Sequence, residues 1–525
     1  MDGTQDNRQA ATGPREATKV VTGKEAGADK GKSGKGKEGK ESKEAVQAIT
    51  PQAVDFSRWY LDVIQKADLM DYAPVRGCIV FKPEGYALWE ACQAGLDRRF
   101  KETGHRNAYF PTLIPASFLE KEKEHVEGFN PELPWVTEAG GEKLEEPLAL
   151  RPTSETIIGS MYAQWIHSYR DLPVLINQWA NVFRWEKRTL PFLRTTEFLW
   201  QEGHTAHATE EEARAETMRM LGVYTDFVQN DLAIPVFRGQ KTPSEKFAGA
   251  VETYSIEAMM KDGKAVQAGT SHYLGTNFAE SFGIRFLDQD NQLRPVHTTS
   301  WGASTRLLGC IVMVHGDDRG LVLPPKIAPT QVVIIPILGA QEREAVLNAA
   351  HQLYDQLRAA GVRVKLDDRE GFRPGWKFNE YEMRGVPLRI EVGPRDLAAG
   401  VVTVGRRDTL EKGQLALNAV TTGVKAMLEE VQANLFRKAQ QFQAEHTSDA
   451  ETLADLEQLL ETKGGFVLAG WCGEAACEAK VKEQTKATSR NMPLEIPGHL
   501  SVHPHAHCLV CGRPAIHQVW FARAY

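Results

Sequence analysis

The sequence lacks any apolar run of about eighteen residues, so we expect no membrane-spanning helix. Its first residues contain no continuous apolar segment, and they include Asp2, Asp6 and Glu16. Both features argue against a secretory signal and against an acid-poor transit peptide. The cytoplasm is therefore the simplest expected compartment.

Aromatic residues are absent from residues 1–50, which are rich in Gly, Ala, Ser, Thr, Lys and acidic residues. Such a segment cannot bury enough apolar surface to offset its conformational entropy. We therefore predict a disordered Lys/Gly-rich tail over residues 1–50. Its simplest role is to keep the chain in solution, although its lysines could also interact weakly with RNA phosphates.

An excess of positive charge is also missing, because the 525 residues carry a formal net charge of −7. Composition alone therefore does not indicate a nucleic-acid-binding protein. A nucleic-acid ligand would need basic residues that gather locally, as in Lys187-Arg188 and between Arg369 and Lys377. The length allows roughly three to four domains.

Cysteine is scarce, and four of the seven cysteines lie in the last 54 residues. The other three, Cys78, Cys92 and Cys310, stand among apolar residues, and we interpret them as buried free thiols. The last four form a C-x4-C pair and a C-x2-C pair about thirty residues apart, which is typical of a structural zinc site. Two disulfides or four free thiols are the alternatives. The predicted metal ligands are Cys472, Cys477, Cys508 and Cys511, and the nearby histidines that could substitute for them are His503, His505, His507 and His517.

Two arginine-bearing segments carry the strongest functional signal. Arg184 and Glu186 occupy alternate positions of an expected strand, LINQWANVFRWE, so they should point to one face. A guanidinium suits a phosphate or carboxylate, and the carboxylate can accept hydrogen bonds from an amine such as that of adenine. A second segment ends in Arg306, before the apolar run LLGCIVMVHG. Two such arginines could hold a nucleotide triphosphate without a Gly-rich loop, whereas either one alone would more often be a surface or ion-pair residue.

These segments resemble the sequence motifs of a known family, the class II aminoacyl-tRNA synthetases. Residues 184–186 and 200–204 resemble its motif 2, residues 302–306 its motif 3, and Tyr109-Phe110-Pro111 its motif 1. Arg151-Pro152-Thr153-Ser154-Glu155-Thr156 and Gly269-Thr270-Ser271-His272 match segments of the prolyl-tRNA synthetases. The resemblance extends from about residue 51 to the end, and it indicates the archaeal and eukaryotic type of that enzyme family.

The resemblance implies an α+β catalytic domain over residues 51–326, with an antiparallel sheet flanked by helices. It implies an anticodon-binding domain over residues 327–432, where TQVVIIPIL, VRVKLDD, RIEVG and VVTVGRR alternate with helical stretches and independently predict an α/β domain with a partly parallel sheet. Residues 433–525 would form a small zinc-binding domain. Members of the family are homodimers.

The implied reaction joins L-proline and ATP to prolyl-adenylate and pyrophosphate, and then transfers proline to the 3′ end of tRNA(Pro). By the same resemblance Arg184 and Arg306 are the catalytic residues, and a magnesium ion lies near Gln267. Ser304 stands where the family commonly has threonine. The expected proline-binding residues are Thr153, Glu155, Arg184, Trp200 and His272. The expected ATP-binding residues are Arg184, Glu186, Arg194, Thr195, Gln267, Thr270, Ser304 and Arg306.

Other interpretations of these residues remain open. Thr153 or Ser154 could cap a helix that begins near Glu155, and His272 outside its motif would more often be a core or surface residue. The chain could be a class II synthetase for another small amino acid, such as threonine or serine. It could also be a non-catalytic, RNA-binding relative, although such a protein would be expected to lose a motif arginine. The roughly one hundred residues between motifs 2 and 3 are too few for the family's editing insertion.

Overall fold

The computed structural model describes residues 49–125, 132–339, 341–498, 500 and 506–525. The predicted tail over residues 1–50 therefore lies almost wholly outside the described part of the chain. Residues Gln47–Tyr525 form a single unit by their contacts. Among the described helices, none combines the length and the apolar character needed to cross a membrane.

An eleven-stranded sheet forms the centre of this unit, in the order β20-β21-β23-β22-β9-β10-β11-β14-β8-β7-β3. Its central strands are antiparallel, which confirms the predicted antiparallel catalytic sheet. Only the outer pairs β3–β7 and β20–β21 are parallel. The catalytic strands are β3 (Arg106–Asn107), β7 (Val174–Phe183), β8 (Glu197–His207), β9 (Val236–Gln240), β10 (Glu252–Met259), β11 (Ala265–Gly275) and β14 (His297–Ser304).

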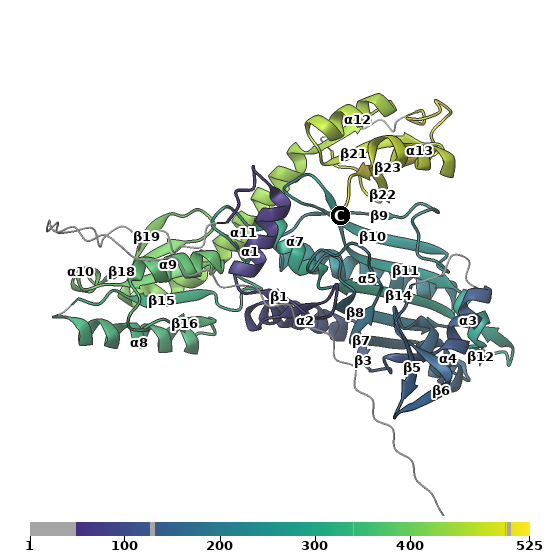
Figure 1. Ribbon diagram of the computed structural model, residues 1–525, viewed down its shortest axis with the longest axis horizontal. Helices are drawn as coiled ribbons and strands as arrows, with labels where there is room; N and C mark the ends of the chain where they lie inside the picture. Colours follow the sequence, from purple (N-terminus) through teal and green to yellow (C-terminus); the bar gives the residue numbers. More distant parts are fainter. Residues whose placement is uncertain (1–48, 126–131, 340, 499, 501–505) are drawn as a thin grey trace, which may run out of the picture. The chain divides into compact units, whose positions relative to one another are not determined.

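Helices cover this sheet and bury the apolar core. Helix α5 (Glu210–Asn230) begins at a Thr209–Glu212 capping box and packs on β11 and β14 (Figure 1). Helix α2 (Pro83–Glu102) has proline in its first turn, and α1 (Phe56–Lys66) is capped by Asp55. Trp301 lies in the middle of this core beside Phe100, with ring centroids 5.0 Å apart. Leu221 and Phe227 of α5 are buried in this core, whereas Met218 is 39% exposed.

Smaller elements surround the catalytic sheet. A three-stranded sheet consists of β4, β6 and β5, and two hairpins pair β1 with β2 and β12 with β13. Helix α7 follows β14 directly, so its first turn lies at the end of that strand. The bounds are β1 (Met70–Tyr72), β2 (Ile79–Phe81), β4 (Leu113–Pro115), α3 (Ala116–His125), β5 (Trp135–Ala139), β6 (Glu142–Leu150), α4 (Glu155–Trp165), α6 (Asn277–Phe282), β12 (Arg285–Leu287), β13 (Leu293–Pro295) and α7 (Arg306–His315).

The next segment forms a separate five-stranded sheet in the order β16-β15-β17-β18-β19. Strands β16, β15 and β17 are parallel and the other two pairs are antiparallel, which confirms the predicted partly parallel α/β sheet. Its elements are β15 (Val332–Pro336), α8 (Arg343–Ala359), β16 (Val364–Leu366), α9 (Pro374–Met383), β17 (Leu388–Val392), α10 (Pro394–Ala398), β18 (Val401–Arg406) and β19 (Lys412–Ala416).

The C-terminal residues extend the catalytic sheet, which the sequence did not indicate. A long helix, α11 (Val420–Glu445), precedes four strands and two helices. Strand β22 pairs antiparallel with β9, with Met492 opposite Gln240 and Pro493 opposite Gly239. We call this junction the β9–β22 seam. The C-terminal elements are β20 (Thr447–Ala450), α12 (Leu453–Thr462), β21 (Phe466–Trp471), α13 (Ala475–Thr485), β22 (Thr488–Pro493) and β23 (His517–Ala522).

Candidate active site

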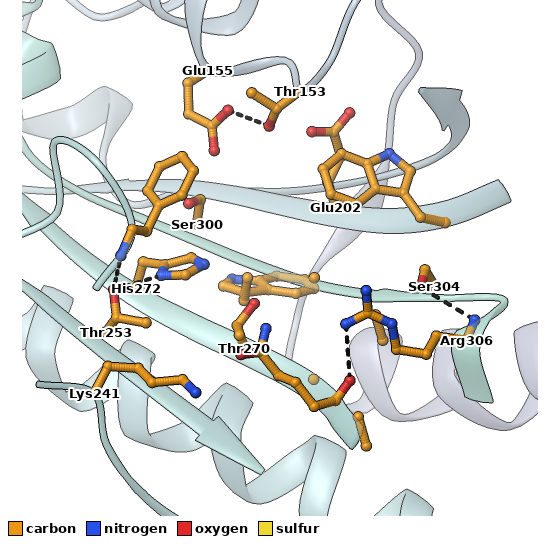
Figure 2. A pocket seen from close by; sticks show the side chains of 18 of the residues that line it. Thr153, Glu155, Glu202, Lys241, Thr253, Thr270, His272, Ser300, Ser304 and Arg306 are labelled. Carbon is orange, nitrogen blue, oxygen red and sulfur yellow. Dashed lines mark hydrogen bonds between the residues drawn. The ribbon is translucent and has the colours of Figure 1, made fainter. Parts of the chain in front are cut away.

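A hollow of about 260 Å³ lies against β8, β11 and β14 (Figure 2). Side chains two residues apart on a strand share a face, so each strand supplies alternate residues to it. The register sets His272 opposite Ser300, and Ser300 opposite His204, so three strands meet in one row. Nine of the predicted site residues line this hollow: Thr153, Glu155, Arg184, Trp200, Gln267, Thr270, His272, Ser304 and Arg306.

Three predicted ATP-binding residues do not line this hollow. Arg194 lines a second hollow of about 340 Å³, and its guanidinium donates to the Tyr525 carbonyl over 3.4 Å. Thr195 is buried, and its hydroxyl donates to the Glu197 carbonyl over 2.7 Å. Glu186 lines neither hollow. The positions of the Thr195 and Glu186 side chains therefore do not support their predicted contact with ATP.

The strand that was expected to carry Arg184 and Glu186 ends earlier than predicted. Strand β7 stops at Phe183, because its partner β8 begins only at the opposite residue, Glu197. Beyond this point the Trp185 amide donates to the Glu132 carbonyl over 3.2 Å instead of to β8. The prediction that Arg184 and Glu186 share a strand face was therefore wrong, although Arg184 does reach the hollow.

Arg184 is held in position by the residues around it. Its Nε donates to the Pro152 carbonyl over 3.2 Å. Its guanidinium lies over the rings of Phe198 and Trp200, 5.5 Å from each ring centroid. Cation–π contacts of this kind fix the orientation of the guanidinium. The group is therefore ready to meet an anionic ligand without rearranging.

Glu202 is a buried carboxylate. It lies in the segment 200–204 that resembles motif 2, but no role was predicted for it. It accepts hydrogen bonds from the Ser154 amide over 3.1 Å, from Gln178 Nε2 over 2.8 Å and from the Ser154 hydroxyl. It also lies 3.0 Å from His204 Nε2. Burial alone would raise the pKa of Glu202, but the hydrogen bonds and the charge of His204 hold it below its ordinary value. The sequence did contain a signal for Glu202: it follows Trp200 by two residues, so both side chains should point to the same face of β8.

This network also decides the capping alternative for the turn before α4. Ser154 occupies the N-cap position, but its side chain makes no hydrogen bond to the helix and contacts Glu202 instead. The Thr153 hydroxyl donates to the Glu155 carboxylate. The helix does begin at Glu155, but the side chains of Thr153 and Ser154 contact carboxylates of the hollow, so the alternative of a side-chain cap does not hold.

Two histidines of the hollow have pKa values shifted in opposite directions. His272 Nδ1 lies 3.0 Å from the Thr253 hydroxyl, and its ring packs on Phe247. Burial, with a smaller effect of His204, lowers the pKa of His272 to about 3, so this ring is neutral at neutral pH. Burial also opposes charge on His204, but the hydrogen bond that its ring donates to Glu202 raises the pKa of His204 above its ordinary value.

Arg306 stands at the first position of α7, where β14 ends. Its Nε donates to the Leu193 carbonyl over 3.1 Å, and its amide donates to the Ser304 hydroxyl over 3.2 Å (Figure 2). Its terminal nitrogen lies 3.4 Å from the Gln267 carbonyl. Arg184 and Arg306 therefore reach the same hollow from different elements, although 122 residues separate them.

The four tail cysteines lie together, as predicted from their spacing, with all four sulfurs within 4.8 Å of one another. They are free thiols, so the disulfide alternative was wrong. Cys472 Sγ lies 3.7 Å from the sulfurs of Cys477 and Cys511. Sulfurs about 2.3 Å from a tetrahedral zinc ion would be about 3.8 Å apart, so the donor set fits this metal. Cys78, Cys92 and Cys310 are buried free thiols, as expected.

The surroundings of the cysteine cluster favour a thiolate at Cys511, whereas burial raises the pKa of Cys477 to about 12. Arg513 Nε lies 3.4 Å from Cys511 Sγ, and the same guanidinium lies 3.6 Å from Cys472 Sγ. These contacts lower the pKa of Cys511 to about 6. Of the histidines considered as substitute ligands, His507 and His517 are not in the cluster, whereas His503 and His505 lie outside the described residues.

Comparison with known families agrees with this geometry. Residues 135–315 match the class II core domain of tRNA synthetases (G, H, P, S and T), residues 331–427 match an anticodon-binding domain, and residues 453–525 match the C-terminal domain of prolyl-tRNA synthetase. The chain belongs to the class II aminoacyl-tRNA synthetases.

Two similar proteins identify the family within the class II enzymes more closely. A proline–tRNA ligase of Symbiobacterium thermophilum is 70% identical over 484 residues, which cover 91% of this chain and 98% of the relative. A proline–tRNA ligase of Natranaerobius thermophilus is 56% identical, with the same coverage of both chains. The chain is therefore a member of the prolyl-tRNA synthetase family. These matches do not distinguish the archaeal and eukaryotic type, which stays a prediction.

Proposed function

We propose that this protein activates L-proline with ATP and transfers the proline to tRNA(Pro). The observation that carries the proposal is the convergence of Arg184, Arg306 and the Thr153–Glu155 pair in one hollow. Two guanidinium groups can neutralise a triphosphate, while a carboxylate suits the cationic secondary amine of proline. A non-catalytic relative would not need both arginines in the same hollow.

The reaction requires the protein to position the substrates and to neutralise their charge more than to supply a nucleophile of its own. Arg184 would contact the carboxylate of proline and the α-phosphate that it attacks, and so stabilise the charge that develops between them. Arg306 would hold the far end of the triphosphate. Glu155 would bind the amine, Trp200 would pack on the ring, and neutral His272 would close the pocket beside them.

The nucleotide would bind next to Gln267, Thr270 and Ser304, which line the same hollow as the two arginines. Arg194 lines the second hollow and could meet the terminal phosphates there. Magnesium would bind mainly to phosphate oxygens and water, so few protein ligands are needed.

The remaining proposals concern the whole chain. Cys472, Cys477, Cys508 and Cys511 would hold one structural zinc ion, which leaves no open coordination position. We also propose domain limits near residues 326 and 432, a homodimer, and a cytoplasmic location, which suits seven cysteines that form no disulfide. In the basic stretch between Arg369 and Lys377, Arg369 binds Asp367 and Glu380, and Lys377 is buried beside Asp367. These ion pairs favour a structural role for both cations.

The test is ATP–pyrophosphate exchange with each of the twenty amino acids. Proline should support the fastest exchange, because the hollow offers a carboxylate for its amine and an apolar wall for its ring. Faster exchange with threonine or serine would identify that amino acid as the substrate in place of proline. No exchange with any amino acid would indicate a non-catalytic protein.

Discrimination against alanine gives a second test. Alanine only fails to fill the space of the ring, which costs roughly 1–3 kcal/mol. The chain between Gly203 and Ser300 is too short for an editing insertion. We therefore expect alanyl-tRNA(Pro) to persist when it is incubated with this protein alone. Deacylation well above the spontaneous rate would contradict the absence of editing.

A further inference from the structure

A buried ion-pair relay runs from the C-terminal strands to the wall of the active-site hollow. Lys241 Nζ lies 2.8 Å from Glu257 Oε1, and Arg490 of β22 lies 2.7 Å from Glu257 Oε2. Lys241 also donates to the Arg490 carbonyl over 2.6 Å. The three side chains are buried. They connect β22 to the cavity across the β9–β22 seam.

Lys241 lies where the two hollows meet. Four residues line both of them, namely Lys241, Glu245, Gln267 and Arg306. Figure 2 shows the Lys241 side chain along the wall of the first hollow, below Thr270 and His272. An ammonium group has three donors, and described residues accept from two of them, which leaves one donor for a ligand.

The charges of this relay do not cancel. Two cations share the single carboxylate of Glu257, and Glu245, which lines both hollows, is a further acidic group whose charge acts on Lys241. A purely structural ion pair would need only one cation, and an extra buried charge is costly unless another group compensates for it. The second hollow adds more positive charge, since the cationic residues that line it are Arg188, Arg194, Lys241, Arg306 and Arg490. Glu245 is the only acidic side chain in that lining.

We propose that Lys241 is a further ligand-binding residue of the active site, which contacts the triphosphate of ATP where the first hollow opens into the second. Arg490 is then a positioning residue: it shares Glu257 with Lys241 and so leaves the lysine enough charge to attract phosphate. This inference rests on the proposed function, because it takes ATP as the ligand. It makes the C-terminal strands part of the nucleotide site.

The seam offers a matched control for this proposal. Arg238 of β9 forms an ion pair with Glu495, and this pair also joins the catalytic and C-terminal segments. Arg238 lines neither hollow. Arg238→Gln therefore removes an ion pair across the seam without touching the relay.

The experiment measures KM for ATP and for proline in ATP–pyrophosphate exchange. Lys241→Met should raise the KM for ATP about tenfold and leave the KM for proline within twofold. This variant keeps Glu257 paired with Arg490, so it should fold. Arg490→Gln should raise the KM for ATP several-fold, because Glu257 then neutralises Lys241 alone, and Arg490→Lys should restore most of the loss. Arg238→Gln should change neither constant.

Several outcomes would overturn the inference. An unchanged KM for ATP in Lys241→Met would remove the lysine from the nucleotide site. Equal changes in both constants in Arg490→Gln, or the same change in Arg238→Gln, would mean that the seam acts only through general stability. Thermal melting of each variant identifies misfolding, and if Arg490→Gln does not fold, Lys241→Met and Arg490→Lys decide. Wild-type protein without proline-dependent exchange would instead refute the proposed function.

Discussion

Two polar clusters of this chain could each hold a metal by their geometry, but they are organised in opposite ways. Glu155, Glu202 and His204 lie within 4.8 Å of one another in the active-site hollow, as do the four tail cysteines in the C-terminal segment. Glu202 and His204 are strand residues, and protein groups already satisfy the Glu202 carboxylate. Cys472 follows strand β21, Cys477 lies in the first turn of α13, and Cys508 and Cys511 lie in a loop before β23. Their sulfurs contact mainly one another and Arg513.

The difference shows what each cluster requires. The Glu202 carboxylate is satisfied without a ligand, because hydrogen bonds from the fold compensate for its burial. Four thiols packed together have no such compensation until a cation binds them. We therefore expect metal to control the stability of the C-terminal cluster and to leave the carboxylate cluster unchanged.

The largest effect should follow from loss of a cysteine. Cys508→Ser should reduce bound zinc from one ion per chain to near zero and destabilise the C-terminal segment, because structural zinc contributes about 10 kcal/mol or more to such folds. Metal analysis and thermal melting measure both effects. Cys78→Ala removes a buried thiol outside the cluster and should keep the zinc. Zinc-free wild-type protein of full stability would contradict the metal site.

A smaller effect in energy, but the largest in activity, is expected for Arg184. Arg184→Ala should slow ATP–pyrophosphate exchange about a hundredfold or more, which corresponds to about 3 kcal/mol for one preorganised donor. Melting temperature and zinc content should not change. Lys187→Ala is the control, because the Lys187 side chain is 83% exposed in the same loop. Near-normal exchange in folded Arg184→Ala protein would remove this arginine from the mechanism.

Glu202→Gln should have a moderate effect that depends on pH. A hydrogen bond to a charged group contributes roughly 1.5–3 kcal/mol, and we expect a loss of stability of about that size. The raised pKa of His204 means that its contribution is fully present below the unfolded pKa of about 6.5 and is lost as pH rises through the folded value. The variant should lose this pH dependence, measured by thermal melting between pH 6 and pH 9. Glu197→Gln, on the same strand, should keep it.

The smallest effect concerns His272. Because its pKa is about 3, its ring should stay neutral from pH 8 down to pH 5, and its nitrogen NMR signals should not titrate in this range. The unfolded chain takes up a proton at this residue below about pH 6.5, so His272 should lower stability as the solution is acidified. A titration midpoint near pH 6 would show that the hollow is more open to water than its geometry indicates.

Local patterns in the sequence predicted much of this molecule. The spacing of the cysteines predicted their cluster, and the alternation of apolar segments with helical stretches predicted the partly parallel sheet. The resemblance to family motifs predicted nine site residues that line one hollow of the structure. These successes share one property: the information lies within a few adjacent residues.

Predictions failed where a distant partner decides the structure. The end of β7 depends on where β8 begins, and neither Arg184 nor Glu186 carries that information. The partners of Lys241 include Arg490, 249 residues away in the sequence, and no local pattern indicates this contact. Ser154 stands at a position in the sequence that is typical of a helix cap, but its hydroxyl donates a hydrogen bond to Glu202, 48 residues later. Long-range pairs of this kind require the folded chain.

The β9–β22 seam also has a consequence for synthesis of the chain. Ribosomes deliver the catalytic strands first, and β9 has its outer edge unpaired until residues 488–493 emerge, about 250 residues later. An unpaired edge strand is a template for association with other chains, and large proteins are exposed to it while they fold. A truncated or stalled product that ends before β22 would keep this edge open. The C-terminal strands therefore cover the outer edge of β9 once they have been made.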